Sequence, residues 1–169
     1  MNQKHRKSVL ISFAVLVGVA AVFFAGKSLL LKQQTGNAAG QNANAVTASG
    51  DLVIEKSGVT AAPSFFPYEI DGTKMEVIAV KASDGTVRTA FNTCQVCYSS
   101  GRGYYKPDGD ALVCQNCGNR FSADQVEQER GGCNPVGITD EYKTETDRTI
   151  TLKKDFFEQT RQIFANWKK

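Results

Sequence analysis

The chain has 169 residues, a formal net charge of +3 and one histidine, His5. Residues 1–50 carry +5 and no acidic residue, whereas residues 51–169 carry 15 cations against 17 anions, or −2. The basic balance therefore comes from the amino-terminal part and does not indicate nucleic-acid binding. Because residues 51–169 contain no histidine and no phosphate-binding loop, hydrolase and kinase classes are excluded, which leaves at most a redox or electron-transfer component.

Residues 1–32 are predicted to form a transmembrane anchor. Lys4, Arg6 and Lys7 precede an uncharged run over residues 8–26 that is rich in Val, Ala, Leu and Phe. At the helical rise this run spans about 28 Å, close to the thickness of a hydrocarbon core. A cleaved signal peptide begins in the same way, but no small-residue cleavage site directly follows the run, so an uncleaved helix is favoured. The cations before the span favour a cytoplasmic amino end.

Residues 33–50 are predicted to be a flexible linker, since they are mostly Gln, Asn, Ala, Gly, Ser and Thr with almost nothing to bury. Such a coil has an r.m.s. reach of about 24 Å. The rest of the chain, residues 51–169, is long enough for one extracytoplasmic domain with a modest core.

The expected fold class of this domain is α+β, with short strands and a carboxy-terminal helix. The predicted elements are strands at 52–55, 75–80 and 86–91, a helix opening at 122 and running to about 129, a strand at 149–152 and a helix over 153–167. Between the first two strands, Pro63 and Pro67 predict a loop without regular ladder pairing, whose aromatic side chains pack inward. The last helix carries an apolar stripe of the kind that usually faces a core.

All five cysteines lie within one stretch of 40 residues: Cys94, Cys97, Cys114, Cys117 and Cys133. The first four form two Cys-x-x-Cys pairs separated by sixteen residues, a spacing typical of four-thiolate metal sites. Short strands at 103–106 and 110–113 around a turn at 107–109 are predicted to form a hairpin. This hairpin brings Cys97 and Cys114 together, as in a zinc ribbon.

Two other uses of the thiols remain open. A disulfide framework is one, because an extracytoplasmic domain meets oxidising conditions, although five thiols cannot all pair within one chain. Thiol redox catalysis is the other, although its Cys-x-x-Cys motif belongs at a strand-to-helix junction rather than in a hairpin. Haem attachment is excluded, because neither pair is followed by histidine.

Cys133 is one sulfur more than a tetrahedral site needs. Gly131 and Gly132 before it allow a close backbone approach, and Pro135 stiffens the chain after it. We therefore expect the Cys133 sulfur within about 8 Å of the others, where it either binds the metal, displaces a ligand or forms a disulfide on oxidation. The alternative is a buried free cysteine that acts as a small apolar side chain.

Several motifs resemble those of the FtrD-like family of bacterial membrane iron–sulfur proteins. They lie within residues 65–138 and are YEIDGTKM at 68–75, VKASDG at 80–85, VRTAFNTCQVC at 87–97, GY at 103–104, CQNCG at 114–118 and GGCNP at 131–135. The last of these is the most specific. The resemblance implies a membrane-associated metal protein linked to bacterial iron uptake, with iron or an iron–sulfur cluster as cofactor and other membrane components of a metal-uptake system as partners.

Two functions follow as hypotheses. In the first, the protein is a single-pass protein of the bacterial cell membrane whose metal transfers electrons or is handed on during iron uptake. In the second, the cysteines hold a structural zinc ion and the domain is a protein-interaction module. The spacing alone suits zinc or a single iron, since the compact cysteine run of bacterial ferredoxins is absent.

Overall fold

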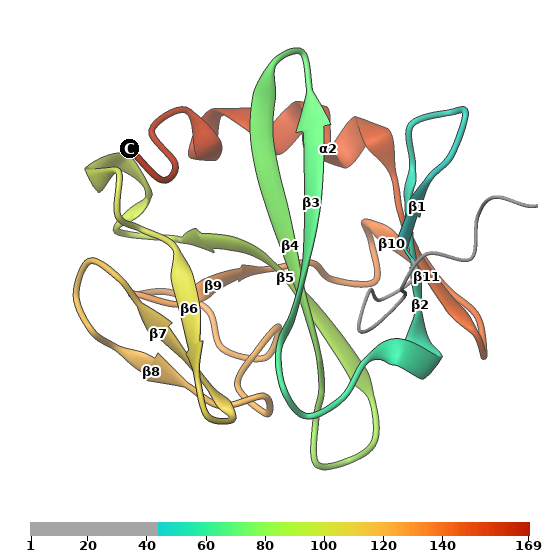
Figure 1. Cartoon of the computed structure of the whole chain (residues 1–169), viewed down its shortest axis with the longest axis horizontal. Coiled ribbons are helices and arrows are strands. Elements are labelled where there is room, and N and C mark those ends of the chain that lie inside the picture. The colour runs from blue at the N-terminus through green and yellow to red at the C-terminus, as the bar shows by residue number, and fades with distance from the viewer. Residues whose placement is uncertain (1–43) are drawn as a thin grey trace, which may run out of the picture. The chain divides into compact units, whose positions relative to one another are not determined.

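The structure is a computed structural model that describes residues 44–169. The predicted anchor and most of the predicted linker lie outside the described residues. Among the helices of the described part, none is long and apolar enough to cross a membrane. The described part is a small β-rich domain with three antiparallel sheets and a carboxy-terminal helix (Figure 1).

The first sheet has the strand order β1-β2-β11-β10 and the second has the order β3-β4-β5-β9. A third sheet of order β6-β7-β8 carries part of the cysteine stretch. The first contains β1 (Asn44–Val46), β2 (Leu52–Glu55), β11 (Thr149–Leu152) and β10 (Lys143–Glu145). The second contains β3 (Ser64–Ile70), β4 (Thr73–Lys81), β5 (Val87–Cys94) and β9 (Pro135–Gly137), and the third β6 (Tyr105–Asp108), β7 (Ala111–Cys114) and β8 (Arg120–Phe121).

Strands β4 and β5 lie at the centre of the domain, because both of their faces are covered. Val77 and Phe91 belong to one core cluster, which also includes side chains of β2, β3, β11 and the carboxy-terminal helix. Ile78 and Ala90, on the opposite faces, belong to a second cluster with Cys94, Cys114 and side chains of the third sheet. Because successive side chains of a strand point to opposite faces, β4 and β5 contribute to both core clusters. Cys94, Cys97 and Cys114 lie in the second cluster.

The carboxy-terminal helix is shorter than predicted. It comprises α2 (Lys154–Thr160), followed by the 3-10 helix η3 (Arg161–Phe164). Its predicted apolar stripe is confirmed, since Phe156, Phe157 and Phe164 are buried. In Figure 1 this segment runs across the top of the domain, and the carboxy terminus ends beside the loop after β5. There the Lys169 N–H donates to the Gly101 carbonyl at 3.1 Å.

The predicted loop with two prolines is wrong, because residues 64–70 form strand β3 and pair with β4. β3 is an edge strand, and an edge strand tolerates proline because only one of its sides has a neighbour to bond. Pro67 lies opposite Glu76 and is exposed. The inward packing of the rings is confirmed for Phe66 and Tyr68, which are buried.

The predicted helix over residues 122–129 is also wrong, because this segment forms consecutive turns. Its capping interaction is present, since the Gln125 side chain accepts a hydrogen bond from the Ser122 N–H at 2.8 Å. The helix does not continue because Glu127 has a φ of +68°, in the left-handed region. Glu127 is held there by contacts to two strands: its carboxylate accepts from the Thr89 N–H at 3.0 Å and pairs with Lys143 at 2.8 Å.

The other predicted strands are confirmed, with small shifts of their ends. β1 lies in the segment predicted as linker and pairs with β2. Three further short strands were not predicted: β8, which has two residues, and β9 and β10, which have three residues each. β9 matters most for the cysteines, because it pairs with β5 and brings the chain after Cys133 next to Cys94.

Candidate metal centre

Three separate parts of the chain deliver the five cysteines. Cys94 is the last residue of β5, and Cys97 lies in the turn that follows it. Cys114 is the last residue of β7, and Cys117 lies in the turn after that strand. Cys133 precedes β9, whose Pro135 is paired with Cys94. The long-range pairing of β9 with β5 therefore adds a third source of thiol to the two Cys-x-x-Cys turns.

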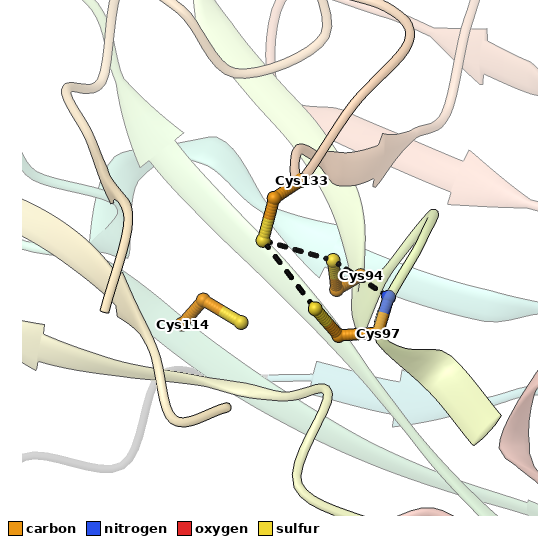
Figure 2. A group of neighbouring side chains, drawn as sticks. All are labelled: Cys94, Cys97, Cys114 and Cys133. Atoms are coloured by element: carbon orange, nitrogen blue, oxygen red, sulfur yellow. Dashed lines mark hydrogen bonds between the residues drawn. The ribbon is translucent and has the colours of Figure 1, made fainter. Parts of the chain in front are cut away.

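Four of the sulfurs form a tight group. The Sγ atoms of Cys94, Cys97, Cys114 and Cys133 all lie within 4.8 Å of one another. Figure 2 shows the sulfur of Cys133 pointing at those of Cys94 and Cys97, at 3.1 and 3.7 Å, while Cys114 points into the same space from the opposite side. Cys117 is outside this group of four, but its sulfur lies 2.7 Å from that of Cys133.

The burial of the five thiols differs. Cys94, Cys97 and Cys114 are buried, Cys133 is half-buried and Cys117 is exposed. The group is therefore closed toward the core by β5 and β7 and reaches solvent on the side of Cys117.

Hydrogen bonds attach the Cys133 loop to the first Cys-x-x-Cys turn. Gln95 bonds to this loop twice: its N–H donates to the Asn134 carbonyl at 3.1 Å, and its side-chain oxygen accepts from the Gly131 N–H at 3.0 Å. The buried Tyr105 donates its hydroxyl proton to the Cys133 carbonyl at 2.8 Å. The Cys133 loop is thus bonded to the first Cys-x-x-Cys turn through Gln95 and to the third sheet through Tyr105, which is paired with Cys114.

The two Cys-x-x-Cys turns also meet through the chain before β6. The Cys94 N–H donates to the Gly103 carbonyl at 2.7 Å, and the Gln115 N–H donates to the Tyr104 carbonyl at 2.8 Å. These two bonds fix the ends of β5 and β7 against the same short segment. The turn after Cys114 closes with a hydrogen bond from the Gly118 N–H to the Cys114 carbonyl at 2.9 Å, and Gly118 has a positive φ of +78°, which glycine adopts without strain.

The thiols in this metal-free form differ in acidity. Burial opposes ionisation of Cys94, but the hydrogen bond from the Cys97 N–H and the contact with Cys133 outweigh it and lower the pKa of Cys94. Burial likewise opposes ionisation of Cys117, yet its contact with Cys133 lowers the pKa of that thiol. Burial raises the pKa of Cys97 to about 11 and, with the contacts to Cys117 and Cys94, raises the pKa of Cys133.

The donor set fits a thiophilic metal. The group of four contains only cysteine sulfur, which suits zinc, iron and iron–sulfur centres rather than magnesium or calcium. In a tetrahedral site with metal–sulfur bonds of about 2.3 Å, the sulfurs are about 3.8 Å apart. Sulfurs that lie within 4.8 Å of one another match this separation. A cluster of several irons would need its cysteine ligands farther apart than these sulfurs lie.

The sequence placed the tetrahedral set at Cys94, Cys97, Cys114 and Cys117, whereas the structure gathers Cys94, Cys97, Cys114 and Cys133 most closely. The expected approach of Cys97 to Cys114 and of Cys133 to the other sulfurs is confirmed. Sequence reasoning missed the supporting roles of Gln95, Tyr105 and Asn134. These roles depend on the short strand after Cys133, and that segment has too few residues to show the alternating pattern of a strand.

Comparison with known proteins supports a metal role for these cysteines. No curated protein and no solved structure matches the chain. The sequence model of one family, described as "Membrane iron-sulfur containing protein FtrD-like", matches residues 60–164. This match covers more than half of the chain and includes all five cysteines, together with the β5–β9 pairing that assembles them. The chain therefore belongs to the FtrD-like family of membrane iron–sulfur proteins.

Proposed function

We propose that the protein binds iron through its cysteine group, as a single ion or as an iron–sulfur centre, and serves bacterial iron uptake by transferring electrons or handing on metal. The observation that supports this most is the group of four cysteine sulfurs within 4.8 Å of one another in a member of a membrane iron–sulfur family. The ligands are drawn from Cys94, Cys97, Cys114, Cys117 and Cys133. When bound, an iron centre supplies a one-electron couple whose potential the surrounding thiolates tune.

The residues around the cysteines have separate tasks in this proposal. Backbone N–H groups in the turns, such as that of Cys97 on the Cys94 sulfur at 3.2 Å, offset thiolate charge. The apolar side chains of the second core exclude water from the buried side. The exposed side leaves room for a partner to accept an electron or a metal. No acid–base chemistry is assigned to the carboxylates.

Metal and sulfide analysis of protein purified without oxygen tests this function. We expect iron in stoichiometric amount and visible absorption from thiolate-to-iron charge transfer. Acid-labile sulfide then separates an iron–sulfur centre from a single iron. Protein that contains neither iron nor the visible bands, both when isolated and after anaerobic loading with ferrous iron, contradicts the proposal.

A structural zinc site is the second candidate, because the sulfur separations match a single tetrahedral ion, and zinc fits such a site as well as a single iron does. In that case the domain serves as a protein-interaction module held together by its metal. Zinc tetrathiolate is colourless, so the same analysis distinguishes the two candidates. Protein that is isolated with one zinc and that does not exchange it for iron supports the structural role.

The membrane arrangement is part of the proposal. In this proposal residues 1–32 form the anchor, the linker is the part of residues 33–50 that precedes strand β1, and the domain that begins with β1 is extracytoplasmic. The family description as a membrane protein supports membrane association. Fractionation tests this arrangement: we expect the chain in the membrane fraction, with residues 51–169 accessible to protease from the outer face. A mature protein that begins after residue 26 and is found in the soluble fraction contradicts the anchor.

A further inference from the structure

The five thiols outnumber the four positions of a tetrahedral site, and the thiol outside the group of four is Cys117. Its sulfur lies 2.7 Å from the sulfur of Cys133. Cys133 is also the member of the group of four that lies closest to solvent, because the other three members are buried. The exposed Cys117 sulfur is thus next to Cys133, the most accessible of the four grouped cysteines.

We propose that Cys117 and Cys133 are alternative ligands for one position of the metal site, and that Cys117 is the thiol through which metal enters and leaves. This inference rests on the proposed metal-binding function and adds a route for exchange. Cys94, Cys97 and Cys114 are the constant ligands in both arrangements. The fourth ligand is Cys133 when the site is closed and Cys117 when it is open to solvent.

Burial supports the direction of this route. A metal ion cannot pass β4, β5 or β7, since their core side chains Ile78, Ala90 and Leu112 are completely or almost completely buried. The remaining approach is the side on which Cys117 is exposed. An ion or an acceptor that arrives from solvent therefore meets Cys117 before it meets the other four sulfurs.

The attachment of the two cysteines supports an exchange between them. Cys133 lies in a loop that Gln95 of the first turn and Tyr105 of β6 hold by hydrogen bonds, whereas Cys117 lies in the turn after β7. A small movement of either the loop or the turn therefore alters which sulfur completes the site. Open space surrounds the loop before Cys133, because a Cβ added at Gly131 or Gly132 meets no atom within 4 Å.

The exchange is balanced in protons and involves no oxidation. When Cys133 becomes the ligand it gives up its thiol proton, and the released Cys117 thiolate takes one up. The reverse transfer opens the site. The two sulfurs are close enough for the proton to pass directly between them.

The test uses the full-length chain in detergent, without oxygen, loaded with Co²⁺ as a spectroscopic probe, and follows transfer of the metal to EDTA. We expect Cys117→Ser to keep one Co²⁺ with the absorption of four thiolate ligands. Transfer of the metal to EDTA should slow by about tenfold or more, which is the size of effect seen when a group beside the direct ligands is removed. Cys133→Ser should also keep four thiolates, by using Cys117, while transfer becomes faster. Only the double variant should show a three-thiolate spectrum.

A matched control is Val96→Ser, which changes an exposed side chain on the first turn without adding or removing a thiol. Its transfer rate should equal that of the wild type. The inference is overturned if Cys117→Ser transfers metal at the wild-type rate or loses a thiolate ligand, or if Cys133→Ser already has the spectrum of the double variant. Wild-type protein that takes up neither Co²⁺ nor iron overturns the proposed function as well, so the two failures are distinguishable.

Discussion

At the scale of single residues, Gly103 shows how closely the chain packs around the first Cys-x-x-Cys turn. A Cβ built on it lies 2.2 Å from the Cys97 carbonyl oxygen and 2.7 Å from the Tyr98 nitrogen, and both neighbours are backbone. We expect Gly103→Ala to lower the free energy of unfolding by about 1–3 kcal/mol, because backbone must shift to relieve the overlap. Urea unfolding measures this, with the exposed Ser99→Ala as control. Equal stability of the two variants contradicts the prediction.

Asn92 supports Tyr105, which in turn holds the Cys133 loop. The buried Asn92 side chain accepts a hydrogen bond from the Tyr105 N–H at 2.7 Å and donates to Glu76 at 2.5 Å. Asn92→Ala leaves the buried N–H of Tyr105 without its partner, so we expect a loss of about 1–3 kcal/mol in unfolding free energy. The exposed Asn119→Ala is the control and should lie within about 0.5 kcal/mol of the wild type.

Much of the residue-scale arrangement was predictable from local signals. The Cys-x-x-Cys spacing predicted that the thiols gather. Cys133 does approach them as predicted, but not through a close backbone approach at Gly131 and Gly132, where a Cβ would meet no atom within 4 Å; these glycines instead supply positive φ angles of +80° and +79°. Membership in the closest group of four was not predictable, because it depends on the pairing of Cys94 with Pro135 across 41 positions of sequence. The roles of Gln95 and Tyr105 depend on the same pairing.

At the scale of elements, the ion pair between Lys143 of β10 and Glu127 fixes the turns before Cys133 to the strands beside them. Both side chains are nearly buried, with exposed fractions of 4% and 11%. We expect Lys143→Ala to cost about 3 kcal/mol of unfolding free energy, because it leaves the Glu127 carboxylate without its cation. Thermal or urea unfolding of the purified variant measures this loss.

The exposed pair Lys154–Glu158 on α2 is the matched control for Lys143–Glu127. Both of its side chains are more than 40% exposed. We expect Lys154→Ala to change the unfolding free energy by no more than about 0.5 kcal/mol. If the two lysine variants are equally stable, the buried pair does not fix the turns as argued.

The strands were easier to predict than the turns. Runs of β-branched and apolar residues identified β4 and β5, although their burial is nearly continuous rather than alternating because both faces are covered. The segment 122–129 has a capping sequence, yet the bonds of Glu127 to Thr89 and Lys143 outweigh a helix preference of a few tenths of a kcal/mol per residue. Strands of three residues, such as β9 and β10, contain too few positions to show a period.

At the scale of the whole molecule, the proposed metal joins parts of the chain that the sheets leave separate. Its ligands come from the second sheet, the third sheet and the Cys133 loop, so binding energy is available only when all three are in place. We expect chelator treatment to lower Tm by about 5 °C or more, since each kcal/mol shifts Tm by about 4–8 °C in a domain of this size. Differential scanning calorimetry measures the shift.

Cys97→Ser is the companion variant for this measurement. We expect it to contain less metal, to unfold at a lower temperature than the wild type, and to respond less to chelator. A chelated wild type with unchanged Tm, or a variant that keeps full metal content and stability, contradicts the link between metal and fold.

Strand β3 has a further consequence for how copies of the protein meet. It forms the open edge of the second sheet, and an exposed open edge can act as a template for a strand from another molecule. Pro67 interrupts that edge, because it has no N–H to offer an incoming chain. The proline that made this segment look like a loop therefore protects the domain from edge-to-edge aggregation, and Pro67→Thr should make the purified domain self-associate as its concentration rises.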